Sequence, residues 1–531
     1  MDALPVIILR HLISFLDSNV DRLMLSLICK RIHKWHTITL HTEPSDESYS
    51  HSSPNLDFYA GNDIVYEDDR REELFNKVLA VPNIESVHFE DCAEDVLDET
   101  LWSAMGDLLT SLQSRGVTQL SLKTFTSEPF VFPSQLTSIS LAGFFGSSLN
   151  GLFPTGLKTL MLGLCFGHTI SPGDLPPHLE TLDIMSGTLF TFQPGVFPNT
   201  LRSLSFCSNM PIIPGTLPPA LRHLTIGAGF DQPLDDGVLP QSLTSLRFES
   251  HYTGNLLGGM MFSHPLTNLP PSLTDLKLPN VYSHVVDHQP LQSLSMWSDY
   301  QKVLCKSDVK YPNLTKLMVY DVLDNLLGVT SKHFPALLIL ETTRDRQSLN
   351  IHHDLSMDLS CLPSGLEHIA MRVPSTLQIL SFPPNLTSMV VAIDHKGVFK
   401  LSAGLLPNSI TSLTLIGYGH PFEQGHLPQS LTKLSIPEHS IDLDPKVLPT
   451  TLRHLIWTTG YTRQFYDFLM VFPASIQRFE LSFNSKIVNL LRINDTTFFR
   501  YHNEDLTECG FTSITSITNQ LKQLNSDSFI H

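Results

Sequence analysis

The chain is built on a repeated pattern of apolar and polar positions around a proline. Leu or Phe precedes this proline, apolar residues follow at the third, sixth and eighth positions after it, and the fifth position is polar. The pattern returns about every 22 residues and defines 13 full copies. Their prolines are Pro133, Pro154, Pro176, Pro198, Pro218, Pro240, Pro270, Pro363, Pro383, Pro407, Pro428, Pro449 and Pro473. A period of this length is typical of a solenoid, in which each coil buries its apolar face only against neighbouring coils.

Apolar sixth and eighth positions around a freer seventh position predict a short β-strand with one buried face. One such strand per coil, stacked in register, forms a curved parallel β-sheet whose inner face carries the fifth, seventh and ninth positions. Proline has no amide hydrogen and holds the preceding residue extended, so we place it before the strand and not within it. A coil of about 22 residues has no room for a long helix, so we expect a mostly irregular convex side.

Five further coils depart from the full pattern. Shortened copies follow Pro82, Pro290, Pro312 and Pro335, and a copy without proline contains Val117, Leu120 and Leu122. Together with the 13 full copies they give about 18 coils between residues 81 and 485.

One stretch of the repeat resembles a named family. Residues 227–248 read GAGFDQPLDDGVLPQSLTSLRF, in which Phe230-Asp231-Gln232-Pro233 is similar to the Phe-Asn-Ile-Pro of the FNIP repeat. The same Leu-Pro phrase also resembles short leucine-rich repeats of the bacterial-effector type. Both resemblances imply a leucine-rich-repeat-like solenoid, which in such proteins is usually a surface for binding other proteins.

The first 40 residues have a different pattern, which predicts two apolar helices. Leu4, Ile8 and Leu12 share one stripe of the first helix, where Pro5 suits the first turn. The second helix begins near Val20. Such helices are often a cap over the first coil of a solenoid. A signal peptide is another interpretation, but the charged residues within and before the apolar stretch argue against it.

The Leu-Pro start, the Asp-containing turn at residues 17–19 and the run Ser-Leu-Ile-Cys-Lys-Arg at 26–31 resemble the F-box. This helical module docks on the Skp adaptor of a cullin-RING ubiquitin ligase, and repeats commonly follow it. The resemblance implies that the adaptor-binding residues are Leu4, Pro5, Ile8, Leu12, Leu27, Ile28 and Cys29.

The remaining segments complete a five-part organisation. Residues 1–40 form the F-box-like module, 41–66 a polar linker and 67–80 a short capping segment. The solenoid occupies 81–485, and residues 486–531 form a C-terminal cap followed by a polar tail. Solenoid ends need such caps because their last strands would otherwise expose apolar residues.

Composition narrows the classes of partner. A net charge of −18 with only 34 basic residues argues against nucleic acid, because phosphate neutralisation needs clustered Lys and Arg. No apolar stretch approaches the roughly 18 residues of a membrane span. Seven scattered cysteines without a Cys-x-x-Cys pair favour reduced thiols in the cytoplasm or nucleus.

The sequence contains no motif for catalysis or for a cofactor. Walker-type loops, Gly-x-Ser-x-Gly elbows and His-Glu-x-x-His pairs are all missing, so we predict neither an enzyme nor a metal site. The pair His352-His353 has no evident third ligand nearby. Asn313 and Asn385 begin Asn-Leu-Thr sequons for glycosylation, but Leu followed by Thr is a frequent product of this repeat.

One set of charged residues is a candidate binding site. Lys433, His454 and Arg478 are the fifth residues after proline in three successive coils. Parallel stacking would align them about 4.8 Å apart on the inner face. Such a row is able to recognise an acidic or phosphorylated segment through charge-assisted hydrogen bonds. The other interpretation is a solvated polar row that Glu480 partly balances.

The F-box resemblance and the repeat together predict a substrate receptor of an SCF-type ubiquitin ligase. In this hypothesis the N-terminal module binds the Skp adaptor and the solenoid binds a protein substrate. The alternative is a repeat scaffold without any ligase association. An enzyme hidden within the repeats is a third and more remote class.

Overall fold

The chain divides into two compact units, Met1–Val286 (unit 1) and Asp287–His531 (unit 2). A computed structural model describes residues 40–42, 64–65, 86–91, 116–123, 132–141, 149–163, 170–184, 192–249, 262–279 and 281–296, and also 309–320, 329–343, 355–373, 377–393, 399–437, 443–458, 472–483, 486–494, 497–501 and 510–513.

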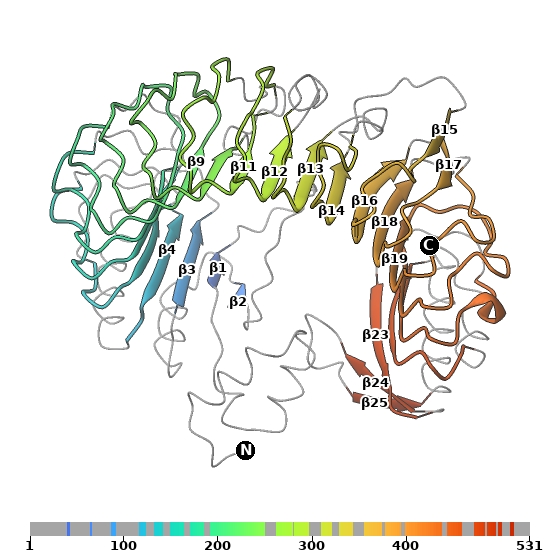
Figure 1. The fold of residues 1–531 in the computed structure, drawn as a ribbon. Coiled ribbons are helices and arrows are strands. Elements are labelled where there is room, and N and C mark those ends of the chain that lie inside the picture. The colour runs from blue at the N-terminus through green and yellow to red at the C-terminus, as the bar shows by residue number, and fades with distance from the viewer. Residues whose placement is uncertain are drawn as a thin grey trace, which may run out of the picture. The chain divides into compact units, whose positions relative to one another are not determined.

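Unit 1 contains a parallel sheet whose strands follow one another in chain order from β3 to β11 (Figure 1). The strands are β3 (Ser86–Asp91), β4 (Gln119–Lys123), β5 (Ser138–Leu141), β6 (Thr159–Leu162), β7 (Thr181–Ile184), β8 (Ser203–Phe206), β9 (His223–Ile226), β10 (Ser245–Phe248) and β11 (Asp275–Lys277). Two short strands, β1 (Leu40–Thr42) and β2 (Ile64–Val65), extend the sheet in the order β2-β1-β3. The segment predicted as a linker therefore contributes strand residues near both of its ends.

Unit 2 continues the same one-strand-per-coil arrangement. Its parallel strands are β12 (Ser293–Met296), β13 (Lys316–Tyr320), β14 (Ile339–Thr343), β16 (His368–Val373), β18 (Ser388–Ile393), β19 (Ser412–Ile416), β20 (Lys433–Ile436), β21 (His454–Thr458) and β22 (Arg478–Phe483). A separate parallel pair joins β15 (Leu355–Asp358) to β17 (Leu377–Ser381). Each of the predicted coils thus contributes a strand at the expected position.

The end of unit 2 changes from parallel to antiparallel pairing. After β22 the chain returns as β23 (Lys486–Arg492), β24 (Thr497–Tyr501) and β25 (Gly510–Ser513), each antiparallel to the strand before it. The sequence pattern predicted a cap in this region but not these strands. Their pairing ends the stack of parallel coils at β22.

The repeat proline begins a tight turn that leads into the strand. In 12 of the 13 full copies the proline carbonyl accepts a hydrogen bond of 2.9–3.2 Å from the amide of the third residue after it, as between Pro218 and Leu221. The strand then starts two residues later, at His223 in this coil. Proline therefore lies in the approach to the strand, as predicted from its missing amide hydrogen.

Three columns of apolar side chains form the core of each unit. The third position after proline is fully buried throughout, for example at Leu221 and Leu431, and the sixth and eighth positions are buried with it. Aromatic rings fill the space behind the strands. Phe230, the first residue of the FNIP-like stretch, is 0% exposed, and its ring centroid lies 6.2 Å from both Phe206 and Phe262.

Hydroxyl side chains connect successive coils through backbone carbonyls. At the second position after proline, hydroxyls donate to the third-position carbonyl of the preceding coil, as from Ser242 to Leu221 at 2.6 Å. At the fourth position, threonines donate to the fourth-position carbonyl before them, as from Thr244 to Arg222 at 3.0 Å. The second-position hydroxyls thus bond third-position carbonyls outside the strand ladder, whereas the fourth-position carbonyls also accept backbone amides of the next coil, as Arg222 does from Thr244 and Ser245. We call these two sets of hydroxyl hydrogen bonds the hydroxyl ladders.

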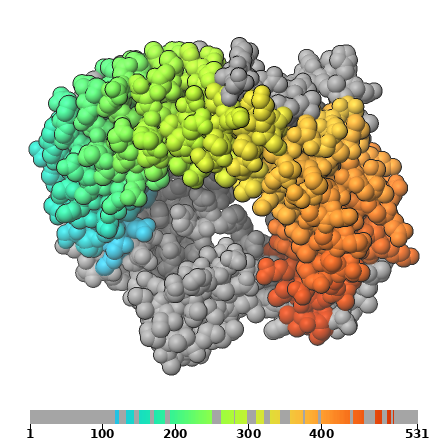
Figure 2. All heavy atoms as spheres, in the orientation of Figure 1, coloured from blue at the N-terminus to red at the C-terminus, as the bar shows by residue number. Residues whose placement is uncertain are grey.

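The outer wall of the coils is irregular, as predicted. In the described part of the chain, the helical structure in this wall consists of one three-residue 3-10 helix, η5 (Pro445–Val447). Polar side chains join coils here too: the Asp231 amide donates to Asn209 Oδ1 at 2.9 Å, and Asp231 Oδ1 accepts from the Ser263 amide at 2.7 Å. Figure 2 shows the coloured coils of unit 1 packed against one another along this wall.

The predicted N-terminal helices are not tested by the structure. Residues 1–39, with all seven proposed adaptor-binding residues, lie outside the described residues, and so does the capping segment 67–80. The F-box module therefore remains a prediction from sequence.

A buried histidine in unit 2 predicts acid sensitivity. The His426 ring is 4% exposed, and its Nδ1 accepts a hydrogen bond of 3.1 Å from the Glu423 amide. Burial lowers the pKa of His426, with the Glu423 carboxylate opposing this shift. Because the neutral ring is favoured in the folded state, its stabilising contribution is present above the ordinary histidine pKa of about 6.5 and is lost as the pH falls.

We therefore expect the urea midpoint of unfolding to decrease between pH 7.5 and pH 5.5. Asparagine at position 426 keeps an acceptor near the place of Nδ1 but does not titrate, so the decrease should be smaller in His426→Asn. His368, whose pKa burial also lowers, accounts for a residual decrease. The same pH dependence in both proteins would contradict this assignment.

Candidate functional site

The sheet surface opposite the buried core is the part of each coil that varies most in chemistry. We call this surface the open face. Side chains alternate along a strand, so the fifth and seventh positions after proline reach the open face while the sixth and eighth are buried. In β9, for example, His223 and Thr225 lie on the open face, whereas Leu224 and Ile226 are buried.

The three residues predicted to form a basic row are aligned on the open face of unit 2. Lys433 pairs in register with His454, and His454 pairs with Arg478, across the neighbouring strands β20, β21 and β22. The equivalent residue of β19 is Ser412, so the charges begin at β20. Parallel stacking at equal offsets thus brings together side chains that are 45 residues apart in the sequence.

Glu480 is the acidic neighbour of this row. Its Oε1 lies 3.1 Å from His454 Nε2, and the two side chains are 39% and 20% exposed. The hydrogen bond from His454 lowers the pKa of Glu480, and the charges of Lys433 and Arg478 lower it further. Glu480 is therefore ionised at neutral pH and holds the His454 ring, with the cations Lys433 and Arg478 on the neighbouring strands.

Apolar side chains occupy the open face next to the basic row. Ala370 faces Val390 across β16 and β18, and Ala392 faces Ile416 across β18 and β19. All four are partly exposed, at positions where other coils carry polar residues. We call these residues the apolar patch. The sequence carries a signal for this patch in the apolar residues at the seventh and ninth positions after proline.

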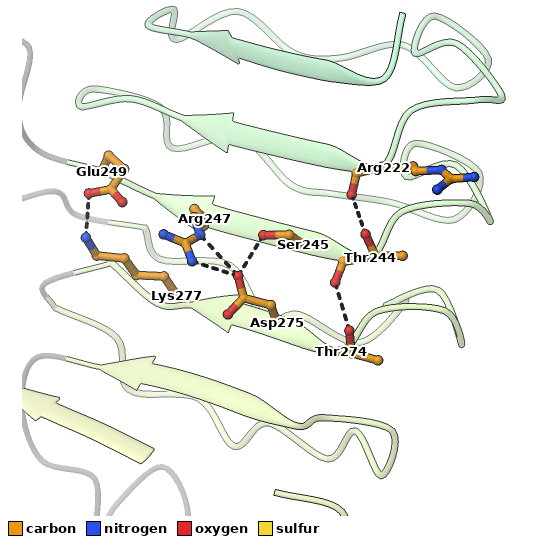
Figure 3. A network of polar contacts seen from close by, with 8 residues as sticks. All are labelled: Arg222, Thr244, Ser245, Arg247, Glu249, Thr274, Asp275 and Lys277. Atoms are coloured by element: carbon orange, nitrogen blue, oxygen red, sulfur yellow. Dashed lines mark hydrogen bonds and ion pairs between the residues drawn. The ribbon is translucent and has the colours of Figure 1, made fainter. Parts of the chain in front are cut away.

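The open face of unit 1 carries a compensated charge network at β10 and β11 (Figure 3). Asp275 Oδ2 accepts from Ser245 Oγ at 2.8 Å and from two nitrogens of Arg247 at 3.0 and 3.1 Å. Lys277 forms a second ion pair with Glu249, in which both side chains are 14% exposed. Every charge of this network faces an opposite charge, so it stabilises the sheet and leaves little net charge for a partner.

The two Asn-Leu-Thr sequons and the histidine pair were the other candidate sites in the sequence. The amides of Asn313 and Asn385 donate to the carbonyls of Gln289 and Ser364 in the preceding coils, so both asparagines support the stack. The pair at 352–353 lies outside the described residues. Where the structure describes the chain, no cluster of three or more His, Cys, Asp or Glu side chains is arranged to hold a metal ion. The same residues include no helix with the length and apolar character needed to cross a membrane.

Comparison with known proteins agrees with the repeat architecture. Residues 209–251, 399–439 and 418–457 match the FNIP repeat family. The first match contains the stretch at 227–248 on which the resemblance rests. No curated protein is significantly similar to the chain.

Two solved structures are similar in fold. The crystal structure of CroV588, described as a novel circular LRR protein, matches with a TM-score of 0.51 and 20% identity over 78% of this chain and 67% of that chain. YopM from Yersinia enterocolitica WA-314 matches with a TM-score of 0.28 and 16% identity over 73% of this chain and 91% of that chain. Stacked parallel coils of this kind are typical of binding scaffolds. The chain is therefore a repeat protein that carries FNIP repeats on a leucine-rich-repeat-like solenoid.

Proposed function

We propose that this protein is the substrate-recognition subunit of an SCF-type cullin-RING ubiquitin ligase. The observation that carries the recognition half of this proposal is the open face of unit 2, where the basic row and the apolar patch lie on neighbouring strands. The ligase half rests on the F-box resemblance of residues 1–40. The protein would act by proximity, raising the effective concentration of a substrate near a ubiquitin-carrying enzyme, with no catalytic residue of its own.

The proposed adaptor interface consists of Leu4, Pro5, Ile8, Leu12, Leu27, Ile28 and Cys29. Apolar side chains on two helices would leave water in a groove of the Skp adaptor. Each side chain contributes about 1.5 to 3 kcal/mol when it is fully buried. A few such residues are therefore enough for a stable complex.

The proposed substrate is a protein segment that combines negative charge with apolar residues. Lys433 and Arg478 are suited to carboxylates or phosphates, and the His454 ring is already oriented by Glu480. The apolar patch lies on β16, β18 and β19, next to β20, where the row begins. A partner crossing these strands would meet apolar side chains first and positive charges next.

A cytoplasmic or nuclear location fits this proposal. Of the cysteines in the described residues, both Cys207 and Cys361 are free thiols. Free thiols are usual in reducing compartments, where the ubiquitin ligases of this class also act.

The ligase assignment predicts that the full-length protein recovers the Skp adaptor in a pull-down. A Pro5→Ala, Ile8→Asp double variant should lose most of this recovery, because a charge replaces an apolar contact and is left without a partner in the groove. Recovery is measured by immunoblotting of the adaptor, and circular dichroism confirms that the solenoid remains folded.

The matched control is Ile213→Asp, which places the same charge on a residue that is 52% exposed in unit 1. This variant should recover the adaptor as the unmodified protein does. If the unmodified protein recovers no adaptor, the chain is a repeat scaffold without ligase association.

A further inference from the structure

The fourth residues after proline form a row along the edge of unit 1 where the strands begin. Successive members are joined through the backbone, as the Arg222 amide donates to the Arg202 carbonyl at 2.8 Å. Because neighbouring strands lie about 4.8 Å apart, side chains at this position are close neighbours. We call this set the rim row. From the coil of β5 to the coil of β11 its members are Thr137, Lys158, Glu180, Arg202, Arg222, Thr244 and Thr274.

Arg202 and Arg222 are adjacent cations in the rim row, and both are exposed. Among the described residues, neither guanidinium group has a hydrogen bond or an ion pair. Figure 3 shows the Arg222 side chain directed away from Thr244 and the charge network of β10 and β11. Glu180, the acidic residue on the other side of Arg202 in the row, pairs with Lys158 at 3.2 Å. Two like charges therefore lie side by side without an anion, although acidic residues outnumber basic ones in this chain.

Other cations at the same position of a coil have partners within the protein. Lys158 has its ion pair, and Arg453 is the fourth residue after Pro449 in unit 2. Arg453 Nη1 donates to the carbonyls of Thr450 and Ser475 at 3.1 and 3.4 Å. An arginine at this position is thus able to bind the backbone of its own coil and of the next coil. The guanidinium groups of the two rim arginines of unit 1 are not used in this way.

The fold would gain from threonine at these two positions. In other coils of the rim row, Thr137 and Thr244 donate their hydroxyls to the preceding carbonyl at 3.2 and 3.0 Å. Arg202 and Arg222 give up this bond of the hydroxyl ladder. They also place like charges on neighbouring strands, which is destabilising. A local choice that works against the fold is expected mainly where it serves a function.

The arginine pair suits a phosphate group. Each planar guanidinium can donate two parallel N–H bonds to phosphate oxygens. Two arginines match a phosphate monoester, which carries a charge of about −1.5 to −2 at pH 7, whereas a single carboxylate balances only one of them. His223, the residue after Arg222, is exposed at the start of β9 and adds a ring N–H donor. The open face beside it carries Ser203 and Thr225, which are small and partly exposed, so the main chain of a peptide has room there.

We propose that Arg202 and Arg222 bind the phosphate group of a phosphoserine or phosphothreonine in a partner protein. The phosphate would lie between the two guanidinium groups, and the segment that carries it would extend over the neighbouring small side chains of the open face. This site belongs to unit 1 and goes beyond the ligase assignment, because it requires neither the adaptor nor the basic row. Phosphorylation of the partner would then control its binding to this surface.

The test uses the full chain with Lys433→Gln and Arg478→Gln as the reference protein, so that phosphate binding at the basic row does not contribute. The outcome is therefore independent of the proposed function. The probe is a capped nonapeptide of Gly and Ala with one central phosphoserine, compared with the same peptide carrying serine. Isothermal titration at constant ionic strength should show at least about tenfold tighter binding of the phosphopeptide. Equal binding of the two peptides would overturn the proposal.

Two further double substitutions are compared in the same reference protein. Arg202→Thr with Arg222→Thr should remove the preference for the phosphopeptide. Lys310→Thr with Lys446→Thr changes the net charge equally at exposed lysines of unit 2 and should preserve it. Loss of the preference in both double variants would show that only overall charge matters, and the assignment to the arginine pair would fail.

A competition experiment distinguishes a phosphoprotein from a free anion. Inorganic phosphate should displace the phosphopeptide only at concentrations well above the dissociation constant of the peptide. If inorganic phosphate binds as tightly as the phosphopeptide, the site holds the free anion and the proposal of a protein partner is wrong.

A stability measurement separates recognition from a structural role. Because threonine fits the hydroxyl ladder and removes the repulsion between like charges, Arg202→Thr with Arg222→Thr should be at least as stable to urea as the reference protein at pH 7. A clear loss of stability would mean that the arginines serve the fold, which would also contradict the proposal.

Discussion

Leu431→Ala is expected to lower the free energy of unfolding of unit 2 by about 2 to 5 kcal/mol. Leu431 is 0% exposed, and both its amide and its carbonyl are held by hydrogen bonds. Its amide donates to the Pro428 carbonyl at 3.2 Å, and its carbonyl accepts from Thr451 Oγ1 at 2.8 Å. The coil therefore has little freedom to collapse around the cavity, which favours the upper part of the range. Urea unfolding followed by circular dichroism measures the change.

Leu380→Ala is the matched control for this substitution. Leu380 belongs to the same unit but is 57% exposed, so its removal should change the free energy of unfolding by less than about 0.5 kcal/mol. Similar losses in the two variants would contradict the assignment of the third-position leucines to the core. Because solenoids can unfold in parts, the comparison should use the transition of unit 2.

The second large effect is expected at the basic row. A Lys433→Glu, Arg478→Glu double variant should bind a diphosphorylated or Glu-rich test peptide at least 100-fold more weakly than the unmodified protein. Two charge-assisted contacts are lost, each of which contributes about 1.5 to 3 kcal/mol. The introduced carboxylates would also repel the ligand and crowd Glu480. Fluorescence anisotropy with a labelled peptide at constant ionic strength measures the affinity.

The control for this experiment has the same change in net charge. Lys310 and Lys446 are exposed lysines of unit 2 that lie outside the row, so Lys310→Glu, Lys446→Glu should keep most of the affinity. Equal losses in the two double variants would show that only the overall charge matters. The row would then be the solvated polar surface that the sequence also allowed.

The strands could be predicted because two periodicities coincide in this chain. The period of two within each strand identified the buried sixth and eighth positions, and the repeat identified where each strand begins. Even the coil without proline was located, since Leu120 lies in β4 as expected. The alignment of Lys433, His454 and Arg478 could be predicted in the same way, because residues at the same distance from the repeat proline become neighbours when the coils stack.

Other features depend on contacts that no periodicity encodes. The hydrogen bond between His454 and Glu480 joins a fifth to a seventh position, and it depends on how two side chains turn in space. The burial of the Asp183 carboxylate beside Ser205 is visible only once its neighbours are placed. The return of β23 against β22 was also missed, because the repeat stops there and nothing in the pattern specifies the next partner.

The hydroxyl ladders have a consequence for how such a chain changes in length. Each coil presents the same carbonyls to the next coil at the same distance from its proline. The Thr244 hydroxyl, for example, donates to the Arg222 carbonyl, and the Thr244 carbonyl accepts from the Thr274 hydroxyl. A duplicated or deleted whole coil would therefore find matching partners on both sides, whereas a fractional insertion within the turn and strand would disconnect them. Natural variants of this architecture should differ in size by integral numbers of coils, with irregular additions confined to the outer loops.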